Sequence, residues 1–162
     1  MSFLLYYQTV ENANFGDQVQ GFQKSFLEKE KRLGNFIESK KKRFLSEGLS
    51  SVTKPGVDHE FYFHVYRNDS LIYWNSNQLP ILNFSDIHFP SDGLLKLQNG
   101  WYYSKTYERG GVLMAASFLI RREYQYENEY LEQEFADDFL LNFDAHLILD
   151  RENTLPIYTN DD

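Results

Sequence analysis

The stretch "NGWYYSKTYERGGVLMAASFLI" occupies residues 99–120 and predicts the centre of the fold. Two strand-like runs flank Gly110-Gly111, a pair that suits a two-residue hairpin turn with positive φ. Pairing outward from this turn places Tyr103 opposite Phe118. The second run is apolar on both sides, which is typical of a central strand that is covered on both faces. The stretch therefore predicts a hairpin in the middle of a sheet.

The same register sorts the side chains of this hairpin onto two different faces. One face is bulky, and its outermost expected pair is Trp101 with Ile120. The other face is small and rich in hydroxyl groups at its middle, where Ser104 lies opposite Ser117. The bulky face predicts a packed core, and the small face leaves room for a pocket.

A second hairpin is expected in "EFYFHVYRNDSLIYWNS", residues 60–76, around an Asn68-Asp69 turn. In this register Phe63 faces Trp74, and both tryptophans of the chain are expected in the core. The period of two then gives one side to Phe61, Phe63, Val65, Ile72 and Trp74, and the other to Tyr62, His64, Tyr66, Leu71, Tyr73 and Asn75.

Residues 15–47 are expected to form one long helix. Their apolar residues recur at spacings of three, four or seven, which marks one stripe of a helix: Val19, Phe22, Phe26, Leu33, Ile37 and Phe44. A helix of about 30 residues is roughly 45 Å long, longer than a small domain needs. Part of it is therefore expected to project, or to pair with a second copy in a homodimer.

The remaining segments complete an α+β arrangement in a single domain, residues 1–162. The sheet is expected over 57–122, interrupted by an irregular connection at 77–93. A helical segment is expected at 123–143 and a final strand pair at 145–158. The predicted fold is a long N-terminal helix packed on a central antiparallel sheet of about five to six strands.

The composition narrows the classes of function. A net charge of −8 disfavours nucleic acid as a partner, because phosphate binding needs a basic surface. The chain has no cysteine, which excludes disulfides and thiolate chemistry and leaves the compartment open. The apolar start "SFLLYY", residues 2–7, is too short for a membrane span. It is either a short strand or the remnant of a hydrophobic segment from a longer protein.

Catalytic and metal-binding patterns are missing from the sequence. The four histidines lie in separate segments, and no zinc, P-loop or nucleophile motif is present. No metal, cofactor or catalytic residue is therefore predicted. His64 alone stands out, as a donor to a ligand, as a base, or as a structural histidine.

Tyrosine, histidine, serine and arginine side chains gather on the less bulky side of the expected sheet. Small residues at its centre leave volume, and polar groups at its rim converge, as in pockets for small ligands. An alternative is that a short helix fills the same space. The candidate ligand-binding residues are Tyr62, His64, Tyr73, Tyr102, Ser104, Ser117 and Arg121.

Five stretches resemble one family. They are "FQKSFLEKEKRL" (22–33), "RNDSLIYWNSNQLP" (67–80), "LQNGWYY" (97–103), "SFLIRREYQYENEYLEQEF" (117–135) and "LPIYTND" (155–161). Together they are similar to the extracytoplasmic sensor regions of Bacteroidetes-type sensor histidine kinases. The resemblance implies a Cache- or PAS-like fold at the periplasmic face of the inner membrane, flanked by two membrane spans. It also implies a homodimer that passes a ligand or protein signal to a cytoplasmic kinase.

Three functions remain open at this point. The first is a receptor input domain without catalysis of its own. The second is a small cone-like α+β enzyme with His64 as its base. The third is a protein-interaction domain that uses the 77–93 loop and has no pocket, which a solid core beneath Ser104 and Ser117 would favour.

Overall fold

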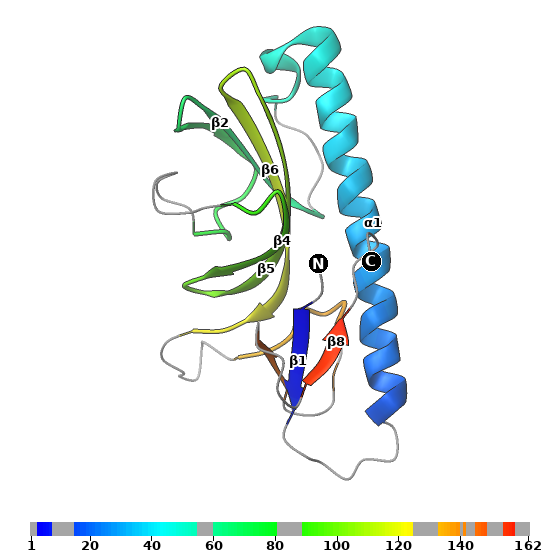
Figure 1. Ribbon diagram of the computed structural model, residues 1–162. Coiled ribbons are helices and arrows are strands. Elements are labelled where there is room, and N and C mark those ends of the chain that lie inside the picture. The colour runs from blue at the N-terminus through cyan, green and yellow to red at the C-terminus, as the bar shows by residue number, and fades with distance from the viewer. Residues whose placement is uncertain are drawn as a thin grey trace.

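A long helix lies along one face of a curved antiparallel sheet in the computed structural model of the chain (Figure 1). The structure describes residues 3–7, 15–54, 60–80, 89–124, 133–139, 141, 145–148 and 154–157. The helical elements are α1 (Phe15–Glu47) and the short 3-10 helix η1 (Leu49–Ser51). The strands are β1 (Phe3–Tyr7), β2 (Tyr62–Arg67), β3 (Ser70–Trp74), β4 (Asp92–Leu97), β5 (Gly100–Arg109), β6 (Val112–Arg122), β7 (Ala145–Ile148) and β8 (Thr154–Ile157).

The strands form two sheets. The larger one has five strands in the order β3-β2-β6-β5-β4, all antiparallel, with α1 packed on one face. This confirms the predicted α+β arrangement and the predicted helix bounds. The smaller sheet has the order β7-β1-β8 and lies beside the first half of α1 (Figure 1).

The central hairpin β5–β6 has the predicted turn. Gly110 and Gly111 have φ values of 59° and 73°, which glycine adopts without strain. From this turn the expected register holds as far as the pair Tyr102 and Leu119. Ser104 therefore lies opposite Ser117, as predicted.

A β-bulge changes the far end of this hairpin. Trp101 pairs with Arg121 instead of Ile120, so Ile120 is an extra residue on β6. The predicted pairing of Trp101 with Ile120 is therefore wrong. An extra residue moves every later side chain of that strand to the face opposite to the one predicted. Arg121 therefore lies on the side of the sheet that α1 covers.

The hairpin β2–β3 turns at Asn68-Asp69, as predicted, and it also contains a bulge. Tyr66 pairs with Leu71 but Val65 pairs with Tyr73, so Ile72 is the extra residue of β3. Tyr73 is thereby turned toward α1, and Trp74 faces away from it beside His64. The predicted faces of Tyr73 and Trp74 are both wrong for this reason.

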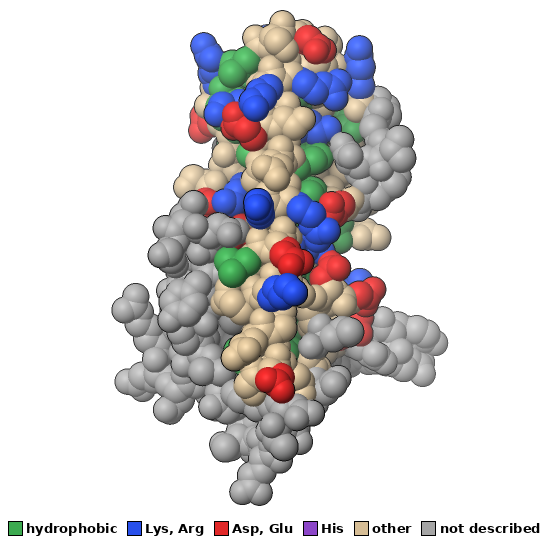
Figure 2. All heavy atoms as spheres, turned by 90° about the vertical axis from the view of Figure 1, so that its right-hand side faces the viewer, with side chains coloured by type: hydrophobic (Ala, Val, Ile, Leu, Met, Phe, Trp, Pro, Cys, Tyr) green, Lys and Arg blue, Asp and Glu red, His purple; other side chains and the backbone are tan. Residues whose placement is uncertain are grey.

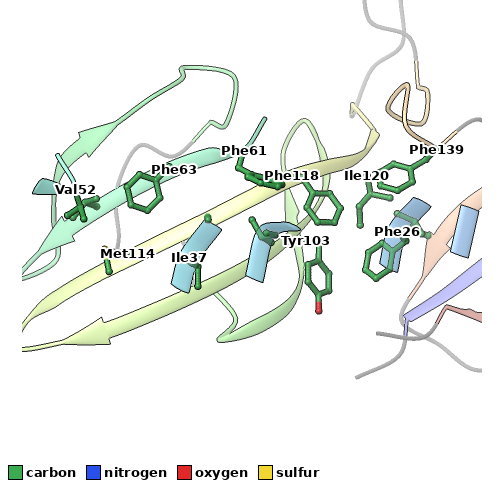
Figure 3. Packing of buried hydrophobic residues seen from close by; sticks show 14 of the residues in the cluster. Phe26, Ile37, Val52, Phe61, Phe63, Tyr103, Met114, Phe118, Ile120 and Phe139 are labelled. Carbon is green, nitrogen blue, oxygen red and sulfur yellow. The ribbon is translucent and has the colours of Figure 1, made fainter. Parts of the chain in front are cut away.

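Aromatic rings fill the space between α1 and the sheet (Figure 3). Phe26 of α1 meets the ring of Tyr103 edge-on at 5.0 Å between centroids, and that of Phe118 at 5.9 Å. Farther along the helix, Phe36 contacts Phe63 of β2 at 5.4 Å. Each such buried side chain contributes roughly 1.5–3 kcal/mol, so this interface is the main apolar core.

A buried polar cluster lies within the same interface. Glu30 of α1 is fully buried, and the Tyr103 hydroxyl lies 2.8 Å from its Oε1 and 2.6 Å from Asp92 Oδ1 of β4. The Lys105 ammonium lies 2.6 Å from Asp92 Oδ2 and 3.5 Å from Glu30 Oε1. Burial, aided by these carboxylates, raises the pKa of Tyr103 well above its ordinary value. The cluster ties the middle of α1 to an edge strand.

The outward face of α1 is polar. Figure 2 shows charged side chains along it, and its exposed residues include Lys24, Glu28, Lys31, Ser39 and Lys42. Among the described residues of α1, Leu45 is the one large apolar side chain that is exposed, so this face carries no apolar seam of the kind that holds coiled coils. The homodimer through this helix stays a prediction, and such a contact would depend on polar and charged groups.

The terminal segments differ in part from the expectation. The apolar start of the chain forms a strand, β1, which lies between β7 and β8, so the two expected final strands do not pair with each other.

The helical segment expected at 123–143 falls partly outside the described residues. Its described part, 133–139, is not helical, because Phe135 bridges to Arg121 and the backbone amide of Ala136 donates to the Ile120 carbonyl at 2.9 Å. Residues 81–88 of the irregular connection also lie outside the described residues.

Candidate functional site

The sheet face turned away from α1, called the outer face here, carries five of the seven candidate site residues. Tyr62, Ser117 and Ser104 lie side by side in one row across β2, β6 and β5. His64, paired with Ala115, lies in the adjacent row nearer the hairpin turns, and Tyr102, paired with Leu119, lies in the adjacent row farther from them. The sequence therefore predicted this group of neighbours correctly.

The other two candidates lie on the opposite face. Tyr73 packs against the apolar core beneath α1, with its ring 6.2 Å from that of Phe63. Arg121 is 4% exposed, and its guanidinium carbon lies 5.4 Å from the centre of the Phe135 ring. The two bulges described above place both side chains there, so neither contributes to a pocket on the outer face.

The centre of the outer face is buried. Ser104 and Ser117 are fully buried, and the Ser117 hydroxyl lies 3.0 Å from the Ser104 hydroxyl, which in turn donates to the Ala116 carbonyl at 3.3 Å. Tyr102 is 1% exposed and donates its hydroxyl to Asn99 Oδ1 at 3.0 Å. These three residues line neither of the two pockets described below, so a pocket wall at this place stays a prediction.

A pocket opens farther along the same face, toward the edge strand β3. Its volume is about 320 Å³, near the lower end of the range for small-ligand sites. His64 of β2 lies on its inner side, and Trp74 of β3 forms an exposed wall. Among the described residues, the lining consists of His64, Leu71, Trp74, Ser76, Asn77, Leu79 and Pro80. We call it the His64–Trp74 pocket.

His64 is the one candidate residue that lines this pocket. Its side chain is 2% exposed, and its Nδ1 has no hydrogen-bond partner among the described residues. Burial lowers the pKa of His64 to about 4, so the imidazole is neutral at pH 7. A buried nitrogen without a partner is uncommon in folded proteins, and it offers a hydrogen bond to a ligand.

Trp74 was expected in the core but is 50% exposed. Its indole Nε1 donates to Asn77 Oδ1 at 2.7 Å, which fixes the orientation of the ring. The extra residue Ile72 is the physical reason for its position, because it reverses the faces of the residues that follow. Sequence reasoning therefore missed Trp74, together with Leu71, as a pocket residue.

A second cleft, of about 380 Å³, lies where β2 begins beside β6 and the 133–139 segment. Its polar groups are largely engaged with each other: Lys29 pairs with Asp138, and Arg122 with Glu134 at 2.6 Å. Tyr62 opens onto this cleft and donates its hydroxyl to Gln78 at 3.0 Å. Burial raises the pKa of Tyr62. Because its charges are already paired, this cleft is the weaker candidate.

The described residues include no group of three or more histidines and carboxylates that could hold a metal ion. The described lining residues of the His64–Trp74 pocket include no carboxylate that could orient His64 as a base. His59 and His88 lie outside the described residues, and His146 falls in β7. Among the described helices, none is long and apolar enough to cross a membrane.

The chain matches no family model, and neither the curated proteins nor the solved structures contain a significant match to it.

Proposed function

We propose that this chain is a ligand-sensing input domain of a membrane-bound sensor histidine kinase, on the extracytoplasmic side of the membrane. The proposal combines the sequence resemblance with one structural observation. The His64–Trp74 pocket and the α1 interface occupy opposite faces of the same two strands.

Alternating residues of β2 connect these two faces directly. His64 lines the pocket, while its neighbours Phe63 and Val65 are buried in the core beneath α1. Phe63 also contacts Phe36 of α1, at 5.4 Å between ring centroids. A ligand that displaces His64 therefore also displaces the adjacent residue Phe63, which contacts α1 directly.

The strand β3 repeats this arrangement. Trp74 lines the pocket, and the preceding residue, Tyr73, packs on Phe63 in the core. In the proposed mechanism, the ligand binds one arrangement of α1 more tightly than another, and the helix passes the difference through the membrane. Such a shift requires a difference in affinity between the two arrangements.

The test uses the full-length parent protein in membrane vesicles, with autophosphorylation as the readout. The reading frame is expected to encode a hydrophobic span on each side of residues 1–162 and a kinase core after the second. Trp74→Ala is expected to remove the response to the signal. Ile72→Ala is the matched control, because Ile72 is 40% exposed on the same strand but does not line the pocket. A parent without spans or without a kinase core contradicts the proposal.

Two observations favour a second candidate, a protein-docking surface. Ser104 and Ser117 are fully buried at the centre of the outer face, and Ile72 and Trp74 are both exposed at the edge of the sheet. Exposed large apolar side chains often mark protein contacts. If a protein docks on this edge, Ile72→Ala and Trp74→Ala would weaken the response to the signal equally. If a ligand binds in the pocket, only Trp74→Ala would weaken that response.

A further inference from the structure

Among the described residues, the lining of the His64–Trp74 pocket has no charged group. Its seven residues are apolar or uncharged polar side chains, since His64 is neutral at pH 7. An ion that enters a pocket without a counter-charge loses hydration that nothing replaces. The second cleft differs in this respect, because lysine, arginine and carboxylate side chains line it.

The exposed wall is a flat aromatic surface. Trp74 is 50% exposed although it is the largest apolar side chain of β3, and its bond to Asn77 fixes the indole plane. Leu71, Leu79 and Pro80 supply apolar contacts around it. This geometry suits a ligand with a ring that lies against the indole face.

The inner side carries one hydrogen-bonding side chain without a partner for one of its atoms. His64 Nδ1 has no partner among the described residues, and because it is buried, the imidazole must turn toward the pocket for a ligand to reach it. A neutral imidazole carries one donor nitrogen and one acceptor nitrogen. A hydroxyl group both donates and accepts, so it matches Nδ1 in either tautomer.

We propose that the His64–Trp74 pocket binds an uncharged molecule whose ring stacks on Trp74 and whose hydroxyl group bonds to His64 Nδ1. This assignment rests on the proposed sensing function and names the class of ligand at the same site. It disfavours carboxylates and amines, because the described lining holds no charge to pair with them.

The experiment compares four probes with one ring in common: benzyl alcohol, toluene, benzoate and benzylamine. The protein carries Trp101→Phe, which leaves Trp74 as its single tryptophan, and binding is followed by quenching of Trp74 fluorescence at pH 7. Benzyl alcohol is expected to bind saturably, roughly 2- to 10-fold more tightly than toluene, which lacks the hydroxyl. Benzoate and benzylamine are expected to bind roughly tenfold or more weakly than benzyl alcohol.

His64→Leu is expected to remove the advantage of benzyl alcohol over toluene while leaving toluene binding unchanged. The comparison of the four probes on the unsubstituted His64 stands even if this variant fails to fold. Benzoate or benzylamine binding as tightly as benzyl alcohol overturns the proposed ligand class, and so does the absence of saturable benzyl alcohol binding up to its solubility limit.

The failure of the sensing function has a different signature. If benzyl alcohol and related uncharged ring alcohols bind as described, yet the autophosphorylation of the parent protein is insensitive to Trp74→Ala, the ligand class stands and the sensing role is contradicted.

Discussion

On the face of the sheet that α1 covers, aromatic rings from the helix and the strands contact one another directly, as Phe26 does with Tyr103 and Phe118. On the outer face, the middle is closed by small hydroxyl side chains, and toward β3 a pocket remains with a buried histidine and an exposed tryptophan. The same strands supply both faces. The difference places the aromatic core beneath the helix and the His64–Trp74 pocket on the face that the helix leaves uncovered.

The strongest test of this contrast is Phe26→Ala. Phe26 is fully buried and contacts two aromatic rings of the sheet, so its removal leaves a cavity. We expect a loss of about 3–5 kcal/mol in the free energy of unfolding, measured by urea denaturation. A loss below about 1 kcal/mol would mean that α1 does not pack on the sheet in this way.

The pH dependence of stability tests the burial of His64. The unfolded chain binds a proton near the ordinary pKa of 6.5, whereas the folded protein does so only at about 4. The contribution of this group is therefore complete above pH 6.5 and is lost as the pH falls from 6.5 toward 4, by about 3 kcal/mol. Urea titrations across that range measure it. His64→Gln is expected to flatten this part of the profile, and unchanged profiles would show that His64 is accessible to water.

The serine pair tests whether the centre of the outer face is closed. Ser104→Ala leaves the buried Ser117 hydroxyl without its partner, so we expect a loss of about 1–3 kcal/mol. Replacing both serines by alanine removes the unsatisfied group, and we expect the double variant to be more stable than the single one. The free energies of unfolding of the three variants give the comparison. Additive losses would mean that water reaches this site.

Trp74→Ala is expected to have the smallest effect on stability. Half of this side chain is exposed, so its removal should change the free energy of unfolding by about 0.5 kcal/mol or less. The same urea titration used for Phe26→Ala measures it, which gives two aromatic truncations on opposite faces. A loss comparable to that of Phe26→Ala would place Trp74 in the core.

The sequence predicted the helix, both hairpin turns and most of the central register, because periodicity and turn residues are local signals. It failed at the two bulges. Each bulged residue is an isoleucine that follows a leucine, Leu71-Ile72 and Leu119-Ile120, so either residue suits an apolar face. No local pattern shows which of the two is extra. The faces of the residues beyond each bulge were therefore assigned wrongly.

The candidate site was predicted in part for the same reason. His64 lies on β2, which has no extra residue, and its face was predicted correctly, whereas Tyr73 and Trp74 follow the extra residue Ile72 on β3 and lie on the faces opposite to those predicted. The burial of Ser104 and Ser117 depends on how neighbouring strands and segments pack, which a single sequence does not encode in a readable pattern.

The phenol of Tyr103 has a further consequence. It carries one proton but lies within hydrogen-bonding distance of two acids, Glu30 on the helix and Asp92 on the edge strand. At any instant the hydroxyl donates its hydrogen to one of the two carboxylates, and rotation about the C–O bond of the phenol redirects the hydrogen to the other. The helix and the edge strand thus compete for one hydrogen atom, so their relative attachment can change without any movement of the backbone.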